Sequence, residues 1–167
     1  MKDFNMTEVS MNKDMKLSEH FTLGELTKTS YKTEDQNIPS RVAIENLKNL
    51  CENWLEDLRY SYNTLYPRVC PQEEVPLVIN SGYRSPEVNK RAGGSSTSNH
   101  LTGCAVDIRV SGFEQAIRYA SILLDISDGT KRDFDELYIE RNKTGSHWIH
   151  FAVRPKGNRR QIDFIKV

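Results

Sequence analysis

Apolar residues recur every three or four positions between Ser40 and Tyr62, and this period predicts the main helix of the chain. The stripe comprises Ile44, Leu47, Leu50, Cys51, Trp54, Leu55, Leu58 and Tyr62. Ser40 follows Pro39 and has the side chain of a helix N-cap. We expect this stripe to pack against a sheet.

Three further segments have the pattern of helices. "SEHFTLGELTKTS" suits a short helix on the domain surface. "SPEVNKRAGG" has Ser85 as a cap and Pro86 at the first helical position, and the glycine pair ends it. "GFEQAIRYASILLDI" is a longer helix, whose expected apolar face is Phe113, Ile117, Ala120, Leu123 and Leu124.

Five segments resemble strands: "VPLVINSGYR", "CAVDIRV", "FDELYIER", "HWIHFAVR" and "RQIDFIKV". The third and fourth are separated by the polar turn "NKTGS". Helices and strands are therefore mixed, and the late strands follow one another closely. This order predicts the α+β class, with a largely antiparallel sheet flanked by helices.

A length of 167 residues suits one domain, which we expect over residues 17–167 after a loosely ordered segment, 1–16. The 23 basic and 23 acidic residues balance, which argues against nucleic-acid binding. No apolar run is long enough to span a membrane. The polar N-terminus lacks a signal-peptide pattern, so we expect synthesis in the cytoplasm, with Cys51, Cys70 and Cys104 as reduced thiols.

The candidate chemistry lies around "STSNHLTGCAVDIRV". Strand alternation places Val106 and Ile108 on one face and Asp107 on the other, so Asp107 need not enter the core. His100 precedes it in a polar loop, and His150 lies in a later strand. Two histidines and a carboxylate are a credible set of zinc ligands, and a three-ligand site without cysteine has the open pattern of catalytic zinc.

His147 stands three residues before His150, and residues three apart on a strand point to opposite faces. Either a bulge re-aims His147 or it lies in the turn before the strand, and we favour the turn. From there it would reach over the metal as an outer group, able to act as a general base. Trp148 should share a sheet face with His150, where it lines either the cleft or the core.

"SGYRSPEVNKRAGGSSTSNHLTGCAVDI" followed by "HWIHF" resembles the M15 family of zinc D-alanyl-D-alanine peptidases, subfamily A. The family motif Ser-x-His-x-x-Gly-x-Ala-x-Asp is matched by Ser98, His100, Gly103, Ala105 and Asp107. "FTLGEL" and "GNRRQ" are similar to phage-type and Bacteroidetes-type members. The resemblance implies the fold shared by the D-Ala-D-Ala peptidases and the hedgehog signalling domain.

The resemblance also implies roles for individual residues. His100, Asp107 and His150 would bind Zn2+, and His147 would be the catalytic base for attack by zinc-activated water. Arg84 would steady the scissile carbonyl oxygen or a substrate carboxylate. Ser98 would hold substrate or the metal loop, and Trp148 completes the expected substrate-binding set.

The implied function is hydrolysis of peptidoglycan stem peptides by a monomer. The split between a carboxypeptidase that removes the terminal D-alanine and an endopeptidase stays open at this stage. Because the sequence has no signal-peptide pattern, we expect the protein to reach the cell wall after release from the cytoplasm, as phage lysis enzymes do. The alternative is a non-catalytic metal-binding interaction module on the same fold, whereas a zinc sensor is disfavoured by the open coordination position. Cobalt or manganese could also fill such a site.

Overall fold

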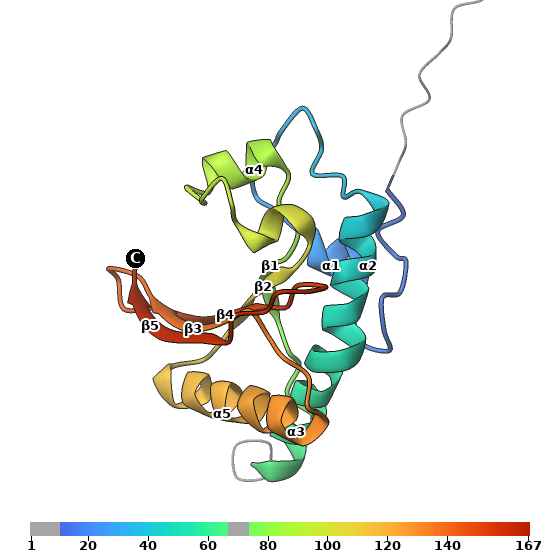
Figure 1. Ribbon diagram of the computed structural model, residues 1–167. Coiled ribbons are helices and arrows are strands. Elements are labelled where there is room, and N and C mark those ends of the chain that lie inside the picture. Colours follow the sequence, from blue (N-terminus) through green and yellow to red (C-terminus); the bar gives the residue numbers. More distant parts are fainter. Residues whose placement is uncertain (1–10, 67–73) are drawn as a thin grey trace, which may run out of the picture.

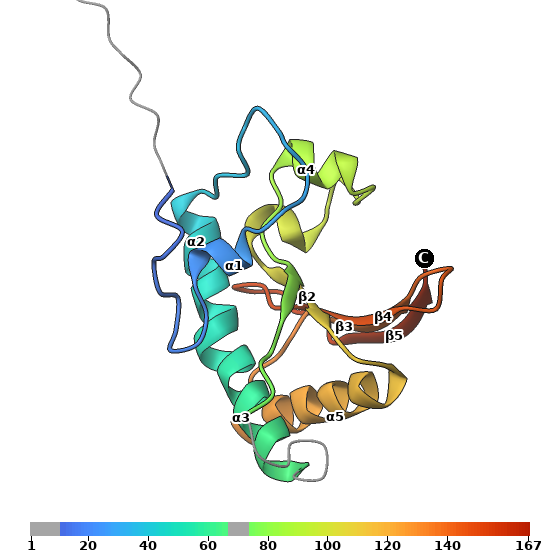
Figure 2. The ribbon, with the colours of Figure 1, turned by 180° about the vertical axis from the view of Figure 1, so that it is seen from behind.

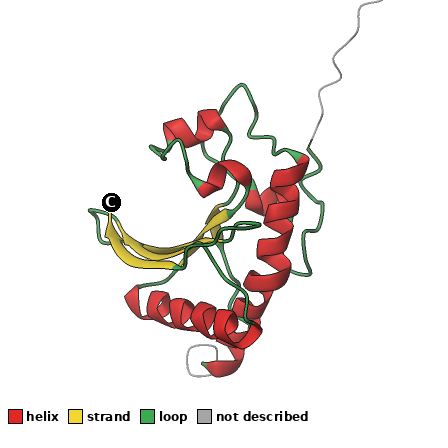
Figure 3. Ribbon diagram, viewed as in Figure 1, coloured by secondary structure: helices red, strands yellow, loops and turns green. Residues whose placement is uncertain are grey.

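The computed structural model describes residues 11–66 and 74–167. Its helices and strands run in the order α1 (Leu23–Leu26), α2 (Arg41–Leu50), η1 (Cys51–Leu55), α3 (Glu56–Leu65), β1 (Ile79–Ser81), α4 (Pro86–Arg91), η2 (Asn99–Thr102), β2 (Ala105–Arg109), α5 (Phe113–Thr130), β3 (Glu136–Arg141), β4 (His147–Ala152) and β5 (Gln161–Lys166). Helices come first, helical segments and strands alternate between β1 and β3, and the last three strands follow one another (Figures 1 and 3).

The strands form one sheet in the order β1-β2-β4-β3-β5. The pairs β1–β2, β2–β4 and β4–β3 are antiparallel, and β5 joins the edge of β3 in parallel. The prediction of an α+β fold with a largely antiparallel sheet is thus confirmed. The central neighbours β2 and β4 are far apart in sequence, so their pairing brings the Asp107 and His150 segments together.

The predicted main helix is confirmed as the run α2, η1 and α3, with Ser40 capping it through a bond from the Ala43 amide. Its middle turn, η1, is a π-helix. Trp54 in that turn is buried against Phe151 of β4, with ring centroids 5.1 Å apart. The stripe therefore packs on the sheet, as expected, and this contact fixes one face of β4 in the core.

Helix α5 lies along one face of the sheet, and α4 stands on the other side (Figures 1 and 2). The predicted apolar face of α5 is confirmed at Leu123, which is buried, and at Ala120 and Leu124, which pack against the core, but it is wrong at its first two residues. Phe113 and Ile117 are 47% and 49% exposed, whereas Tyr119 and Ile122 are buried. The helix is rotated because it buries against both the sheet and α3, where Tyr119 meets Tyr62 edge to face at 4.9 Å.

The segment expected to be loosely ordered divides in two. Residues 1–10 lie outside the described residues, whereas Met11 and Met15 pack against the core and Lys16 pairs with Thr22 in a short bridge. Cys51 and Cys104 are free thiols, as predicted, and both are buried, whereas Cys70 lies outside the described residues. No helix in the part of the chain that the structure describes is long and apolar enough to cross a membrane.

Candidate metal centre

His100 lies in the short helix η2, which follows the polar loop and precedes β2. The Ser98 hydroxyl caps this turn by accepting from the His100 amide, and Gly103 ends it with a positive φ of 71°. The His100 ring is buried, and its Nδ1 lies 2.6 Å from the Gly82 carbonyl oxygen. Because a carbonyl only accepts, Nδ1 carries a hydrogen, and Nε2 is the nitrogen that is left for a metal ion.

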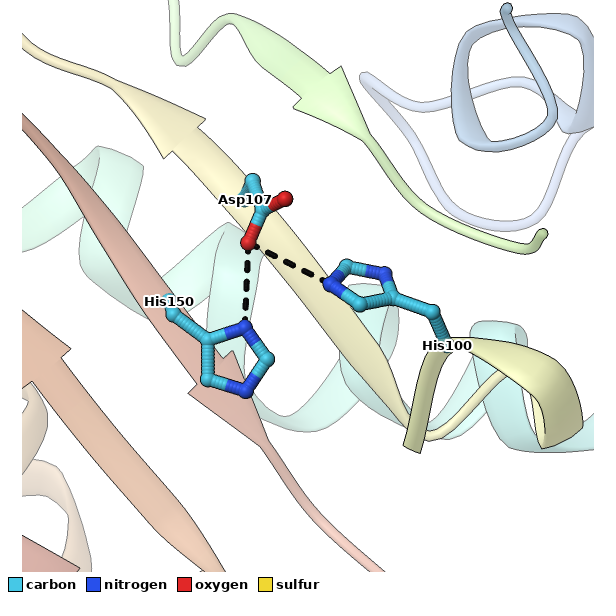
Figure 4. A group of neighbouring side chains, drawn as sticks. All are labelled: His100, Asp107 and His150. Atoms are coloured by element: carbon cyan, nitrogen blue, oxygen red, sulfur yellow. Dashed lines mark hydrogen bonds and ion pairs between the residues drawn. The ribbon is translucent and has the colours of Figure 1, made fainter. Parts of the chain in front are cut away.

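Asp107 and His150 face each other across the antiparallel pair β2–β4. The Asp107 Oδ1 atom lies 3.0 Å from His150 Nδ1 and 3.3 Å from His100 Nε2 (Figure 4). Asp107 is on the face opposite the buried Val106 and Ile108, as its strand alternation predicts. Three segments of the chain thus converge on one carboxylate oxygen.

These three side chains form a group that could hold a metal ion, with donor atoms all within 4.8 Å of one another. Two imidazole nitrogens and one carboxylate oxygen are ligands that zinc accepts, and three ligands leave a position for water. The second nitrogen of each imidazole already has an oxygen partner, Gly82 for His100 and Glu136 for His150. Such outer partners are typical of metal-binding histidines, so the residues fit a zinc ion.

The electrostatics of the group follow from burial and close opposite charges. Burial works to raise the pKa of Asp107, but His100 and His150 outweigh it and hold that pKa well below its usual range. Burial disfavours the charged form of His150, yet its bonds to Asp107 and Glu136 raise its pKa to about 9. Without a metal, ion pairs therefore stabilise the cluster, and a metal ion would take the place of the His150 Nδ1 proton.

Residues 19–131 match the family model described as Peptidase M15. The chain belongs to the M15 peptidase family. The match contains His100 and Asp107, and β4 adds His150 from beyond it. No curated protein matches the chain.

The M15 family consists of metallopeptidases that are generally zinc-dependent, which agrees with the donor set found here. Arg84 lies within the matched residues. Its terminal nitrogen donates to Asp107 Oδ2 at 2.6 Å, and its Nε donates to the Ser81 hydroxyl at 2.8 Å. Arg84 therefore contacts the metal centre through the outer oxygen of Asp107.

The structure does not bring His147 to this cluster. The prediction that His147 lies in the turn is wrong, because β4 begins at His147 and pairs it with Arg141 of β3. On a regular strand it then faces away from His150, and its ring lies 5.2 Å from Phe113 and 6.4 Å from Phe164. It belongs to the side of the sheet that α5 covers.

Sequence reasoning missed two acidic residues of β3, Glu136 and Glu140. The register pairs Tyr138 with His150 and Glu140 with Trp148, and the Tyr138 ring stacks on the His150 ring at 5.5 Å. Glu136 and Glu140 share that face by alternation. The signal was present in "FDELYIER", whose even-numbered residues from Glu136 onward are two carboxylates and a tyrosine, but it could be used only once the β3–β4 register was known.

The electrostatics of Glu140 depend on its burial and on the three candidate ligands. Burial raises the pKa of its carboxyl group. The negative charge of Asp107 also raises this pKa, whereas His150 and His100 act to lower it. Its carboxylate also has a side-chain hydrogen bond to Trp148. Trp148 therefore lies on the metal-centre face, one of the two places that the sequence left open for it.

Ser98 lines a cavity of about 630 Å³ that also reaches Glu136, Arg154 and Lys156. Its hydroxyl is engaged in capping η2, so in this structure it shapes the loop that carries His100. Both expected roles of Ser98, holding substrate and holding the metal loop, stay predictions.

Proposed function

We propose that this M15 peptidase is a zinc enzyme that hydrolyses peptide bonds in peptidoglycan stem peptides. The observation that carries the proposal is the convergence of His100 Nε2, Asp107 Oδ1 and His150 Nδ1, each held by a second partner. The assignment to subfamily A and the choice of a cell-wall substrate rest on the resemblance of the sequence motifs. Membership of the M15 family supports that resemblance. The protein would act on the cell wall after release, as a monomer.

A zinc ion held by these three residues would polarise the scissile carbonyl and lower the pKa of a bound water to about 7. The chain's own residues supply the remaining functions. Arg84 fixes the Asp107 carboxylate by binding Oδ2, and Gly82 and Glu136 fix the two imidazole rings. The site is thus preorganised before substrate arrives.

We assign the general base to Glu140, in place of the expected His147. Glu140 is on the metal-centre face of β3, and the bond to Trp148 holds its carboxylate. A carboxylate whose pKa is raised by burial accepts a proton from water more readily than an ordinary one. Glu140 would take that proton and return it to the leaving amine, while His147 stays on the far face.

The test is mass spectrometry of purified peptidoglycan fragments after incubation with zinc-loaded protein, with Glu140→Gln and His147→Ala as paired variants. We expect products with the wild type and His147→Ala, and a loss of at least a hundredfold with Glu140→Gln. Loss of one alanine mass identifies a carboxypeptidase, and a larger change identifies an endopeptidase. Bound zinc without any product would overturn the proposal and favour the interaction module.

A further inference from the structure

Glu136, the first residue of β3, bridges a metal-ligand candidate and a distant arginine. Its Oε2 atom lies 2.9 Å from His150 Nε2, the nitrogen that faces away from Asp107. Its Oε1 atom accepts from the Arg159 guanidinium at 2.6 Å. The Asn99 side-chain amide donates to Oε2 at 3.0 Å. Glu136 is therefore held by donors on both oxygens.

The contact with Nε2 decides which nitrogen of His150 can bind a metal. Each nitrogen of the ring lies beside a carboxylate that only accepts, Nε2 beside Glu136 and Nδ1 beside Asp107, so both nitrogens carry hydrogen when no metal is bound. A metal ion bound by Asp107 would displace the hydrogen on Nδ1, which lies 3.0 Å from Asp107 Oδ1, while Glu136 keeps the hydrogen on Nε2. With Nε2 as the lone-pair nitrogen instead, the ring would direct its donor atom away from Asp107 and His100.

A second carboxylate, Asp135, fixes the partners of Glu136. Asp135 is fully buried and accepts from Arg159 through Nε at 2.8 Å and the terminal nitrogen at 2.7 Å. It also accepts from the Asn99 amide at 2.8 Å. The same two side chains thus contact Asp135 and Glu136, and they come from segments far apart in sequence.

Hydrogen bonds of Asn99 and Glu136 connect the segments that carry His100 and His150, the two proposed histidine ligands. Asn99 immediately precedes His100 in η2, and its amide contacts the carboxylate that holds His150. Arg159 comes from the segment that leads into β5. The loop of His100, the start of β3 and the approach to β5 are consequently joined at one point.

We infer that Glu136 is a positioning residue, which holds His150 through Nε2 so that Nδ1 is presented to the metal, and that Asn99 and Arg159 hold Glu136 for this role. The inference rests on the proposed zinc site and assigns a function outside its three ligands. Such outer carboxylates typically contribute tenfold to a hundredfold in metal affinity.

The first experiment measures zinc affinity by competition with a chromogenic chelator, for wild type, Glu136→Gln and Glu140→Gln. The two variants remove the same charge from the same face of β3, but Glu140 has no contact with an imidazole nitrogen among those described. We expect at least tenfold weaker binding for Glu136→Gln and less than a threefold change for Glu140→Gln. Equal losses in both variants would overturn the inference, because charge alone would explain them.

A second measurement separates positioning from general damage to the fold. In zinc-loaded wild type, NMR should show a His150 Nε2 proton that exchanges slowly with solvent, since Glu136 accepts it. Glu136→Gln should exchange this proton faster, and Arg159→Gln should have an intermediate effect because it frees only Oε1. Unchanged exchange in Glu136→Gln would overturn the inference.

The two proposals fail in different ways. A wild-type protein that binds no zinc would overturn the metal site and this inference together. A wild type that binds zinc, with Glu136→Gln binding as tightly, would overturn this inference alone.

Discussion

Arg84 and His150 bind opposite oxygens of the Asp107 carboxylate. The arginine donates to Oδ2 at 2.6 Å, whereas His150 Nδ1 lies 3.0 Å from Oδ1. The Ser81 hydroxyl fixes the guanidinium from its other side. Asp107 therefore presents only Oδ1 to the histidines, as a monodentate carboxylate ligand of a metal ion would.

This relationship predicts that Arg84→Gln weakens zinc binding by about tenfold, since it frees an outer partner of a ligand. Chelator competition measures the affinity. The control is Arg109→Gln. Arg109 lies on the same face of β2 as Asp107, but its guanidinium donates to Asn80 and not to Asp107. An Arg84→Gln protein with normal zinc affinity but a raised KM would instead support the substrate contact implied by the family resemblance.

A second prediction concerns His147. Because its ring packs on Phe113 and Phe164, His147→Ala should cost about 1 kcal/mol of stability and change peptidase activity by less than threefold. Chemical denaturation and a kinetic assay measure the two effects. His150→Ala is the reference, since it should abolish zinc binding. A loss of activity of a hundredfold or more in a folded, zinc-bound His147→Ala protein would return the base role to His147.

The sequence was most informative where one local rule acted alone. The period around Trp54 predicts the main helix, and alternation around Asp107 predicts which way the carboxylate faces. The group of side chains that could hold a metal ion needed little more, because His100 and Asp107 share one short motif. The fold class followed from the order of these elements.

The errors arose where pairing or tertiary packing decides. His147 was misplaced because the exact start of β4 is set by its pairing with Arg141, which no local pattern encodes. Ile117 was placed in the core because its helical spacing fits, but α5 turns a different face toward α3 and the sheet. Glu136 and Glu140 were missed because their positions beside the histidine and the tryptophan of β4 depend on the β3–β4 register, which the sequence does not give.

A third prediction tests how the loop of His100 is fixed to the helical layer. Gly103 has a φ of 71°, and a Cβ there would collide with the Ala43 backbone of α2. Gly93 has a similar φ of 73° but open space around it. Both alanine variants bear the conformational strain, of about 1 kcal/mol, and only Gly103→Ala also displaces the loop.

We therefore expect Gly103→Ala to lower the free energy of unfolding by about 2 kcal/mol more than Gly93→Ala does. It should also weaken zinc binding, because His100 lies three residues away on the displaced turn. Thermal denaturation and chelator competition measure the two effects. Equal destabilisation by both variants would show that the contact with Ala43 does not fix this loop.

The last prediction concerns acid stability. Burial works to raise the pKa of Asp135, but hydrogen bonds from Arg159 and Asn99 outweigh it and lower the pKa to about 2. The unfolded value is about 3.9, so the folded state binds the proton less tightly than the unfolded state does. Asp135 therefore contributes stability that is fully present above about pH 4 and is lost as the pH falls toward 2.

Asp135→Asn should accordingly lower the free energy of unfolding by about 2 kcal/mol at pH 7, and by progressively less between pH 4 and pH 2. Urea denaturation of the zinc-free protein across this range measures the difference. Asp163→Asn, an exposed carboxylate on β5, is the matched control and should have little effect at either end. A constant difference between wild type and Asp135→Asn from pH 7 to pH 2 would mean that the ionised form of Asp135 does not stabilise the fold. The contribution of Asp135 would then be one of shape and hydrogen bonding, and its bonds to Arg159 would persist through protonation.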